Sequence, residues 1–446
     1  MAAYLALLAL AACGGGGGSG DAVSATAPPV AAAPSPTTGS AGSGDLTPAI
    51  AQSTTPNVQP IKVSALPTRV RNMLITSVTV CAPGTSNCAT IDSIQVDTGS
   101  QGLRLLASAL PATLALPAMP AAGGGAAGTS GTSGTGGTSG TSDSAGSGTG
   151  TGTSIGSGGI SGECAVFGTG FTWGAVRSAD VRLAGQVAAS LPVQVIADPV
   201  LPAVPDDCAR SGPSMMTPAT LRVNGILGIG LFAVDCGSAC ASAARPRWYY
   251  ACDASGACTP SSQPIEAQVA NPVSRFATDN NGVVIDLPAI ADTGVPQVEG
   301  SLIFGIGTQA NNALAGTTVL KANAQTGYVT TVSNGQSWPL SFVDSGSNGM
   351  FFADPGLPQC GIWYCPSAQQ TLTATLRGTD GATATVAFPV ANAQTLLGSS
   401  NNAFHNLAGF SSTMFDWGLP FFFGRRVYTA IEARATPVGK GPFYAF

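Results

Sequence analysis

Two short segments of this chain are near copies of each other, and they constrain its fold more than any other feature. Residues 94–103 read IQVDTGSQGL, and residues 341–350 read SFVDSGSNGM. Each segment has an apolar run, then Asp, a hydroxyl residue, Gly, Ser, a variable residue, Gly and an apolar residue. One copy lies in the first quarter of the chain and the other in the last quarter, so we expect each copy to belong to its own lobe.

Paired carboxylates explain why such a motif occurs twice. Hydrolysing a peptide bond without metal, His or Cys requires a base that deprotonates the attacking water and an acid that protonates the leaving group. Two neighbouring carboxyl groups that share one proton supply both, because two like charges close together resist ionising together and one pKa is raised. We therefore predict that Asp97 and Asp344 are a catalytic pair. Turn glycines and hydrogen-bonding hydroxyls predict the supporting residues of the two loops, which are Thr98, Gly99, Ser100, Ser345, Gly346 and Ser347.

The composition favours a β-rich fold. Hydrophobic residues make up 44% of the chain and charged residues only 9%, with 59 Gly and 32 Pro. Helical bundles need many more charged residues on their outer faces, whereas strands joined by turns suit these proportions. Short apolar or alternating runs between turn signals, such as residues 73–80, 192–196 and 383–388, predict strands, and no long amphipathic helix is indicated. We predict a mainly β fold.

Charge and histidine content exclude several classes of function. The net charge of −5 gives no basic footprint, so we expect no nucleic-acid partner. The single histidine, His405, argues against a His-ligated metal site and against a Ser-His-Asp triad. We predict no metal, no cofactor and no catalytic role for His405. No apolar run reaches the length of about 20 residues that spans a bilayer.

The start of the chain has the pattern of an export signal. Residues 1–13 read MAAYLALLALAAC, a short apolar core that ends in Leu-Ala-Ala-Cys and resembles the lipobox of bacterial lipoproteins. This pattern predicts that Cys13 carries a lipid anchor. Residues 14–56 are rich in Gly, Ala, Ser, Thr and Pro, which predicts a disordered tether. A similar Gly/Ser/Thr tract at residues 121–158 predicts a disordered loop inserted into the first lobe.

The other ten cysteines predict disulfide bonds in an oxidising compartment, because their number is even and most lie in close pairs. The candidates are Cys81 with Cys88, Cys164 with Cys208, Cys360 with Cys365, and the group Cys236, Cys240, Cys252 and Cys258. The sequence leaves the connectivity within residues 236–258 open. A zinc knuckle in that group is the alternative, although the spacing is not a Cys-x2-Cys repeat.

Together with the two Asp motifs, further segments resemble the pepsin-like aspartic peptidases. Residues 167–170, FGTG, resemble the Tyr-Gly-Thr-Gly flap of that family, and residues 224–230, NGILGIG, resemble the stretch that supports its first active-site loop. Residues 417–432 resemble the corresponding stretch of the second lobe. The matching segments occur in the family's order over about residues 57–446. The signature VDTGSxGLR at residues 96–104 also resembles a largely uncharacterised family of exported bacterial proteins.

The resemblance implies a bilobal fold with two β-barrel-like lobes, residues 57–270 and 271–446, and a cleft between them. It implies that an extended peptide substrate lies across the cleft, under a flap that contains Phe167, Gly168 and Thr169. This chain departs from the family in having Phe167 where the family has a tyrosine. A phenyl ring covers a substrate by apolar contact but offers no hydroxyl for a hydrogen bond.

These observations lead to one main hypothesis and two alternatives. The main hypothesis is an aspartic endopeptidase of the bacterial envelope, a monomer that acts on peptides or proteins and is anchored by lipid in the outer membrane. The first alternative is a non-catalytic lipoprotein that binds an extended peptide, a glycan or a partner protein in the same cleft. The second is an envelope scaffold, for which replacing either Asp would affect stability alone.

Overall fold

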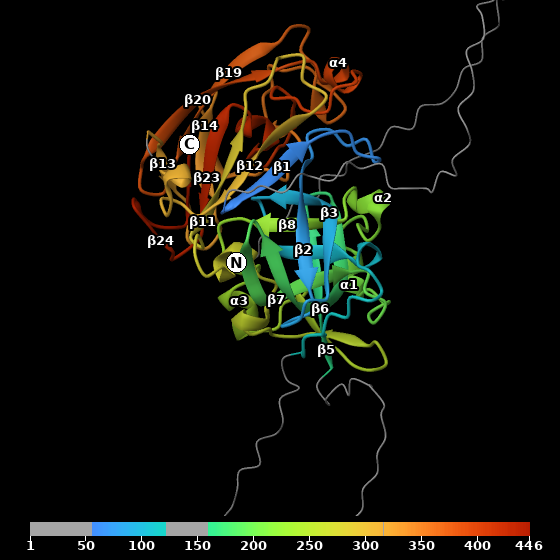
Figure 1. Ribbon diagram of the computed structural model, residues 1–446. Coiled ribbons are helices and arrows are strands. Elements are labelled where there is room, and N and C mark those ends of the chain that lie inside the picture. The colour runs from blue at the N-terminus through green and yellow to red at the C-terminus, as the bar shows by residue number, and fades with distance from the viewer. Residues whose placement is uncertain (1–55, 122–158, 315) are drawn as a thin grey trace, which may run out of the picture.

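The computed structural model describes residues 56–121, 159–314 and 316–446. The predicted signal peptide with Cys13, the tether up to residue 55 and the insertion from residue 122 to residue 158 lie outside the described residues. Figure 1 shows two lobes, one of blue-to-green strands and one of yellow-to-red strands. We call them the first lobe and the second lobe. This arrangement confirms the prediction of a mainly β, two-lobed fold.

The larger sheet has 15 strands and runs through the first lobe into the second. Its strands, in spatial order, are β10 (Cys258–Pro260), β9 (Tyr249–Cys252), β5 (Ile160–Phe167), β6 (Gly170–Leu183), β7 (Gln186–Ile196), β4 (Gln101–Leu106), β8 (Gly225–Ile229), β3 (Cys88–Asp97), β2 (Leu74–Cys81), β1 (Val58–Val63), β12 (Val298–Phe304), β11 (Gly282–Leu287), β23 (Arg425–Ala430), β26 (Phe443–Ala445) and β13 (Val319–Lys321). Strands β2 to β10 belong to the first lobe.

The second lobe has a sheet of nine strands of its own. In spatial order these are β17 (Gln359–Cys360), β18 (Trp363–Tyr364), β21 (Ala408–Phe410), β16 (Met350–Phe352), β22 (Phe415–Trp417), β15 (Gln336–Val343), β14 (Val329–Ser333), β19 (Gln370–Arg377) and β20 (Thr383–Val390). The pair β24 (Ala435–Thr436) and β25 (Gly439–Lys440) forms a separate ribbon. The α-helices are short and peripheral: α1 (Asp206–Ala209), α2 (Pro218–Leu221), α3 (Ser238–Ser242) and α4 (Ala393–Leu397).

Alternating burial explains how the second lobe forms its core. In β20 the side chains of Val386, Phe388 and Val390 are buried, while the residues between them face outward. Phe388 packs edge-on against Trp417, with ring centroids 5.2 Å apart, and Phe415 stacks on Trp417 at 4.7 Å. Each buried ring of this kind contributes about 1.5–3 kcal/mol through the hydrophobic effect. The aromatic cluster therefore holds β20 and β22 together.

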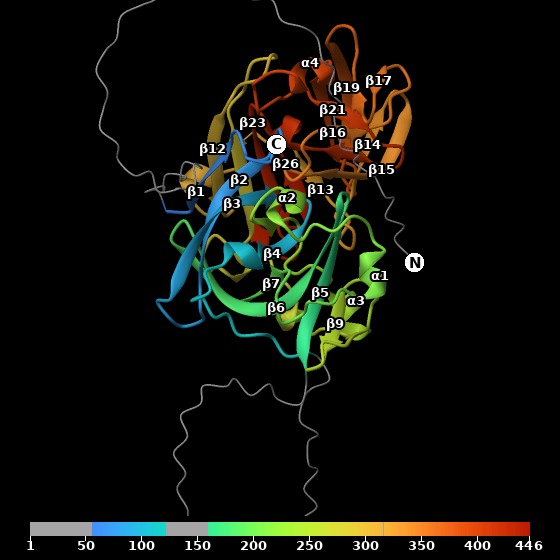
Figure 2. The same cartoon turned by 90° about the vertical axis from the view of Figure 1, so that its right-hand side faces the viewer.

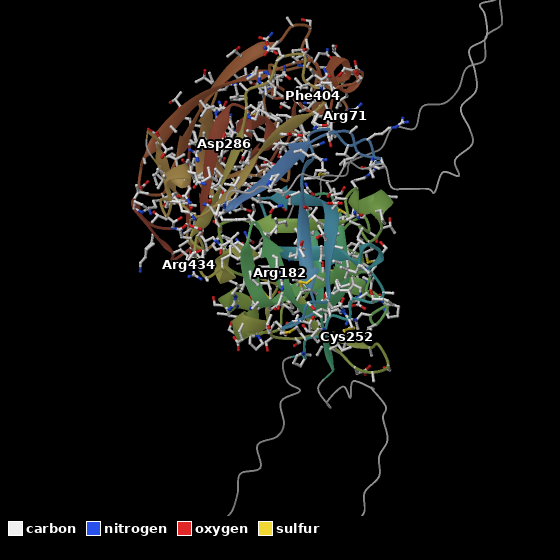
Figure 3. The ribbon with its side chains drawn as sticks, in the orientation of Figure 1. Arg71, Arg182, Cys252, Asp286, Phe404 and Arg434 are labelled. Atoms are coloured by element: carbon white, nitrogen blue, oxygen red, sulfur yellow. A yellow bond between two sulfur atoms is a disulfide. The ribbon has the colours of Figure 1, made fainter. Side chains whose placement is uncertain are left out.

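Strand β1 joins the two lobes. It pairs with β12 over six residues, from Val58 opposite Ile303 to Val63 opposite Val298, and it pairs with β2 through its last two residues. The loop after β1 adds further contacts, because Asn72 donates hydrogen bonds to the carbonyls of Asn348 and Phe404 across 2.9 and 2.8 Å. Figure 3 shows Arg71 and Phe404 near each other at this junction. The lobes are thus connected by backbone pairing and by buried polar contacts.

All ten cysteines of the described residues form disulfide bonds. The pairs are Cys81–Cys88, Cys164–Cys208, Cys236–Cys240, Cys252–Cys258 and Cys360–Cys365. The pairing settles the connectivity of residues 236–258 and leaves no thiolate there for the zinc alternative. Five disulfides indicate that the chain folds in an oxidising, non-cytoplasmic compartment. Within the described ranges, no helix has the length and apolar character needed to cross a membrane.

Candidate active site

The two predicted catalytic carboxylates each stand at the end of a central strand. Asp97 is the last residue of β3, and Asp344 directly follows β15. β3 pairs in parallel with β8, so that Asp97 lies opposite Gly228, and β15 pairs in parallel with β22. The segments that were predicted from the family resemblance to support the two loops therefore do lie beside them. Buried apolar residues such as Val96 and Val343 fix both strands in their lobes.

The loop after β3 holds the Asp97 carboxylate by two hydrogen bonds. The backbone N–H of Gly99 donates to Oδ1 across 2.8 Å, and the hydroxyl of Ser100 donates to Oδ2 across 2.5 Å. Only 7% of Asp97 is exposed. Hydrogen bonds from these two donors fix the orientation of the Asp97 carboxyl group.

The loop after β15 repeats this pattern around Asp344. The backbone N–H of Gly346 donates to Oδ1 across 2.7 Å, and the hydroxyl of Ser347 donates to Oδ2 across 2.8 Å. Near copies in the sequence thus produce near copies of the hydrogen-bond geometry, one in each lobe.

Two hydroxyl residues connect the loops to each other. Thr98 donates its hydroxyl to the carbonyl of Val343 across 3.0 Å, and Ser345 donates its hydroxyl to the carbonyl of Val96 across 2.8 Å. Each hydroxyl oxygen also accepts the backbone N–H of the other residue, at 2.9 and 3.1 Å. Both side chains are almost fully buried, at 2% and 1% exposure. This reciprocal exchange fixes the position of one loop on the other.

The loops approach so closely that a glycine is required in each. A Cβ atom added to Gly99 would lie 2.7 Å from Cγ of Asp344, and one added to Gly346 would lie 2.5 Å from Oδ1 of Asp97. Real Cβ atoms do not approach other atoms this closely. The backbone of each loop therefore lies against the carboxyl group of the other lobe, and the structure brings Asp97 and Asp344 together as the sequence predicted.

The electrostatics of the pair are unequal. Burial raises the pKa of Asp344 well above its ordinary value, and the negative charges of Asp97 and Asp416 raise it further. Asp416 lies in β22 with 4% exposure, and burial together with the charge of Asp97 raises its pKa to about 8, while a hydrogen bond from Ser347 opposes this. Three carboxyl groups therefore share one small region, and the second lobe is where a proton is retained.

The predicted flap residues lie at a hairpin turn. Strands β5 and β6 pair from Gly162 opposite Ala175 to Phe167 opposite Gly170, so Gly168 and Thr169 form the exposed turn. The hydroxyl of Thr169 contacts the sulfur of Met215 at 3.1 Å. Figure 2 shows the β5–β6 hairpin reaching from the first lobe towards the level at which the lobes meet.

A buried cluster of charges supports both the first loop and this hairpin. Arg104 of β4 contacts Glu163 of β5 at 2.5 Å and Asp235 at 3.1 Å, and all three side chains are at most 4% exposed. Tyr249 donates its hydroxyl to Asp235 across 2.6 Å. The guanidinium of Arg104 also lies 5.7 Å from the ring centroid of Phe167, within the range of a cation–π contact. Arg104 thus links β4 to the flap hairpin.

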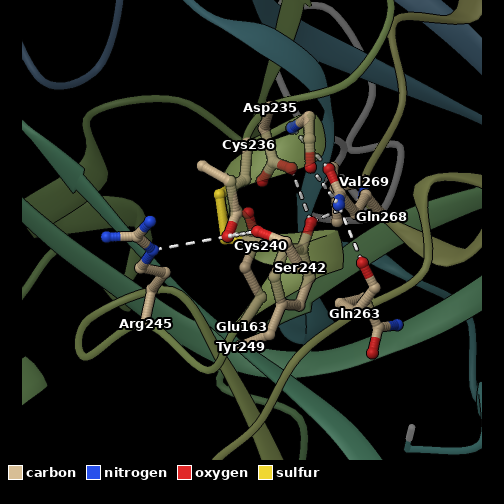
Figure 4. The surroundings of a disulfide bond; sticks show 12 residues. Glu163, Asp235, Cys236, Cys240, Ser242, Arg245, Tyr249, Gln263, Gln268 and Val269 are labelled. Atoms are coloured by element: carbon tan, nitrogen blue, oxygen red, sulfur yellow. Dashed lines mark hydrogen bonds between the residues drawn. A yellow bond between two sulfur atoms is a disulfide. The ribbon is translucent and has the colours of Figure 1, made fainter.

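Figure 4 shows Glu163, Asp235 and Tyr249 beside the Cys236–Cys240 disulfide. Burial raises the pKa of Asp235 well above its ordinary value, and the neighbouring Glu163 raises it further. One arginine balances only one of the two carboxylates, so the cluster retains a proton on the other. His405 lies away from this region and contacts Asp292 at 2.8 Å.

Sequence reasoning missed Asp416, Glu163, Asp235 and Tyr249. Arg104 was recognised only as part of a signature. For Asp416 the signal was present: it stands two residues before Gly418, where the first lobe has the apolar Ile226 two residues before Gly228. An acidic residue in place of an apolar one, in only one copy of a repeated stretch, is a signal that could have identified Asp416 as a candidate site residue. Glu163 and Asp235 contact Arg104, and Tyr249 contacts Asp235, from separate parts of the chain, and no local pattern indicates these contacts.

One protein family and several solved structures resemble this chain. A family model described as "Protein of unknown function (DUF3443)" matches residues 53–141 and 133–446. None of the curated proteins compared with the sequence matches it. Among the matching solved structures is the crystal structure of aspartic proteinase from Irpex lacteus, with 14% identity and a TM-score of 0.47 over 87% of this chain and 96% of that chain.

Proposed function

The chain belongs to the DUF3443 family, whose function is unknown, and we propose that it is an aspartic endopeptidase that activates a water between Asp97 and Asp344. The observation that carries this proposal is the pair of carboxyl groups in matching loops, each held by a glycine N–H and a serine hydroxyl. The reciprocal hydrogen bonds of Thr98 and Ser345 support it, because they keep the two groups at one separation.

The raised pKa of Asp344 supports different roles for the two carboxyl groups in the proposed reaction. Asp344, whose pKa is raised, carries the shared proton, and the ionised Asp97 accepts a proton from the water. The resulting oxygen nucleophile attacks the peptide carbonyl carbon, while Asp344 gives its proton to the carbonyl oxygen. Asp97 then delivers the proton it accepted to the leaving amine as the C–N bond breaks. The proton on the carbonyl-derived oxygen returns to Asp344 when the carboxylic acid product forms, which restores the starting state.

The loops contribute by fixing geometry before the substrate arrives. The backbone N–H groups of Gly99 and Gly346 each donate to one oxygen of a carboxyl group, and the serine hydroxyls donate to the other oxygen. Preorganised donors of this kind need little rearrangement during the reaction. In the proposal, Phe167 at the end of β5 covers the substrate by apolar contact, with its ring positioned over Arg104.

The proposal includes a place in the cell. The disulfides require an oxidising compartment, and we propose that Cys13 anchors the chain by lipid in the envelope of a bacterium, in the outer membrane. The peptidase domain would then act as a monomer on extended peptides or unfolded proteins outside the cytoplasm.

The proposal is tested by incubating the purified full-length chain with a mixture of denatured proteins between about pH 3 and pH 8, a range that brackets carboxyl pKa values. We expect cleavage by the wild type, and loss of cleavage by about a thousandfold or more in both Asp97→Asn and Asp344→Asn. Asp292→Asn is the matched control, because its side chain is 66% exposed and contacts His405 rather than the carboxyl pair.

Circular dichroism of all four proteins separates loss of chemistry from loss of fold. Cleavage that survives in a folded Asp97→Asn or Asp344→Asn protein would contradict the proposal. A folded wild type that cleaves nothing but retains peptides would favour the alternative of a binding protein.

A further inference from the structure

The second lobe presents one face of its sheet on the same side as Asp344, and an unusual row of residues lies on it. Phe342 of β15 is directly opposite Asp416 of β22, and Asp416 is directly opposite Phe351 of β16. Residues that face each other across neighbouring strands point to the same side of a sheet. Phe342 is two residues before Asp344, so the row and the Asp344 carboxyl share a side.

Burial along the strands confirms which side this is. Val343, Phe415 and Trp417 alternate with the row and are fully buried in the aromatic core. Phe342 and Phe351 are only half-buried, as residues that face away from the core should be.

Two further aromatic rings extend the row at either end. The ring of Tyr328 lies 5.9 Å from that of Phe342, and the ring of Trp363 lies 5.4 Å from that of Phe351. Both are half-buried. We call the four rings of Tyr328, Phe342, Phe351 and Trp363 the aromatic row. Asp416 stands in the middle of it, between two rings.

The Asp416 carboxyl group is incompletely satisfied. Its Oδ1 atom is buried and has no hydrogen-bond partner, although only 4% of the residue is exposed. Burial and the charge of Asp97 raise its pKa to about 8, and only the hydrogen bond from Ser347 acts in the other direction. A buried polar atom without a partner is destabilising, and a ligand that donates a hydrogen bond to it would remove that cost.

A cation would interact favourably with both the Asp416 carboxyl group and the aromatic row. An ammonium or guanidinium group donates hydrogen bonds to a carboxylate, and it is attracted to the faces of aromatic rings within about 6 Å. A neutral apolar side chain would satisfy the rings but would leave Asp416 without a partner. An acidic side chain would be repelled by the negative charge of Asp97, which also raises the pKa of Asp416.

We propose that Asp416 and the aromatic row form a substrate subsite next to the carboxyl pair, and that this subsite binds a lysine or arginine side chain of the peptide. This inference rests on the proposed peptidase function, because it assigns a specificity to the same site. It makes the chain an endopeptidase that selects basic residues near the cut bond. The matching position of the first lobe, Ile226, gives that lobe an apolar subsite instead.

The preference for a cation depends on pH. The titratable groups near Asp416 are Asp97, Asp344 and Tyr444, whose own pKa burial raises. Without a cation Asp416 is neutral below about pH 8. A bound cation stabilises the ionised form, so the preference for lysine over a neutral residue increases as the pH rises from 5 towards 8.

The test uses the full-length chain and peptides in which Lys or Met occupies one position at a time within about four residues of the cut bond. Met has nearly the length of Lys without its charge. At one position, we expect a Lys-over-Met ratio of kcat/KM of roughly tenfold or more at neutral pH, the factor that a charge-assisted hydrogen bond carries. This ratio is expected to fall to about one in Asp416→Asn and in Asp416→Ile. Asp380→Asn, which removes an exposed carboxylate of the same lobe, keeps the ratio.

Two results overturn the inference. The first is a Lys-over-Met ratio of kcat/KM that is unchanged in both Asp416 variants. The second is an equal loss of activity for the Lys and Met peptides, which would make Asp416 a positioning residue for Asp344. If the wild type cleaves no peptide, the proposed function fails, and fluorescence anisotropy of the same labelled peptides decides the inference separately. Tighter binding of the Lys peptide by the wild type, lost in Asp416→Asn, supports it, and equal binding overturns it.

Discussion

In the first lobe, strand β8 lies beside the Asp97 loop and has the apolar Ile226 two residues before Gly228. In the second lobe, strand β22 lies beside the Asp344 loop and has Asp416 two residues before Gly418. The loops themselves are alike, since each holds its Asp by a glycine N–H and a serine hydroxyl. The first loop continues into β4, where Arg104 is buried among acidic residues. The second loop has a third carboxyl group close to its Asp.

This comparison shows how a symmetric framework acquires different roles on its two sides. The repeated motif determines the positions of Asp97 and Asp344, and a residue outside the motif, Asp416, changes the electrostatics around Asp344. Burial, Asp97 and Asp416 all raise the pKa of Asp344. In the first lobe, by contrast, a buried arginine binds the acidic residues of its own cluster. Geometry is therefore shared between the lobes, while electrostatics differ.

The largest loss of activity is expected from substitutions in the Asp97 and Asp344 loops, where the two lobes are most alike. Gly99→Ala and Gly346→Ala each place a methyl group within 2.7 Å of the carboxyl group of the other lobe. The backbone cannot move without breaking the reciprocal hydrogen bonds of Thr98 and Ser345, and the carboxyl group cannot move without losing its glycine and serine donors. We therefore expect peptidase activity to fall by about a thousandfold, as it does when a reacting group is displaced. Activity assays and thermal unfolding measure this together.

Gly168→Ala is the folding control for an added methyl group, because nothing lies within 4 Å of its Cβ position. Its melting temperature should match that of the wild type. If Gly99→Ala and Gly346→Ala differ strongly from each other in activity, the two loops are not equivalent in geometry.

A second prediction concerns the buried Arg104 cluster of the first lobe. Arg104→Met leaves Glu163 and Asp235 buried without a cation, so we expect the free energy of unfolding to fall by about 3–5 kcal/mol. Denaturant unfolding measures this change. Adding Glu163→Gln and Asp235→Asn to Arg104→Met should recover part of the loss. Arg210→Met removes only an exposed ion pair with Asp206, so it should change the free energy of unfolding by less than about 1 kcal/mol.

A third prediction concerns the difference between Ile226 in the first lobe and Asp416 at the matching position of the second lobe. The pKa of Asp416 is raised to about 8 in the folded state, so the folded chain binds its proton more tightly than the unfolded chain does. This contribution to stability is fully present at acid pH and is lost as the pH rises from about 4 to about 8. The wild type should lose stability over this range with a slope of about 1 kcal/mol per pH unit from this group.

Asp416→Ile introduces the residue that the first lobe has at the matching position. It should remove the contribution of Asp416 to the slope of unfolding free energy against pH and leave the contribution of Asp344. Denaturant unfolding at several pH values measures both proteins. Asp292→Asn serves as the control, since hydrogen bonds from Gln369 and His405 lower the pKa of Asp292 and keep its titration below this range. An unchanged slope in Asp416→Ile would show that Asp416 is ionised throughout.

The smallest effect is expected at the flap. Phe167→Leu keeps an apolar side chain but removes the ring over Arg104, and a cation–π contact contributes about 0.5–1 kcal/mol at such a site. We expect kcat/KM to fall by roughly two- to fivefold, the factor that this energy implies. Phe167→Tyr keeps the ring and should lose no more. A loss of a hundredfold in either variant would mean that Phe167 takes part in the chemistry.

The sequence predicted those features whose cause is local. Each Asp motif contains its own turn, its own hydrogen-bond donors and its own preceding strand, so its geometry follows from about ten residues. The disulfides between close cysteines and the hairpin turn at Gly168 and Thr169 are local in the same sense. The division into residues 57–270 and 271–446 remains a prediction, since β1 pairs across the lobes.

The features that were missed depend on contacts between distant segments. Arg104 meets Glu163 and Asp235 only after β4, β5 and the segment before α3 have packed together. The aromatic row exists only once β15, β22 and β16 are in register. No local pattern in the sequence indicates which of these segments lie side by side.

The central claim is that Asp97 and Asp344 act as one unit, and a double-mutant cycle tests it most directly. The measurement is kcat/KM on one peptide for the wild type, Asp97→Asn, Asp344→Asn and the double variant. If the two carboxyl groups share one proton and one water, each single variant should fall to the level of the double variant, within about threefold. Effects that multiply, so that the double variant loses the product of the two single losses, would contradict the account.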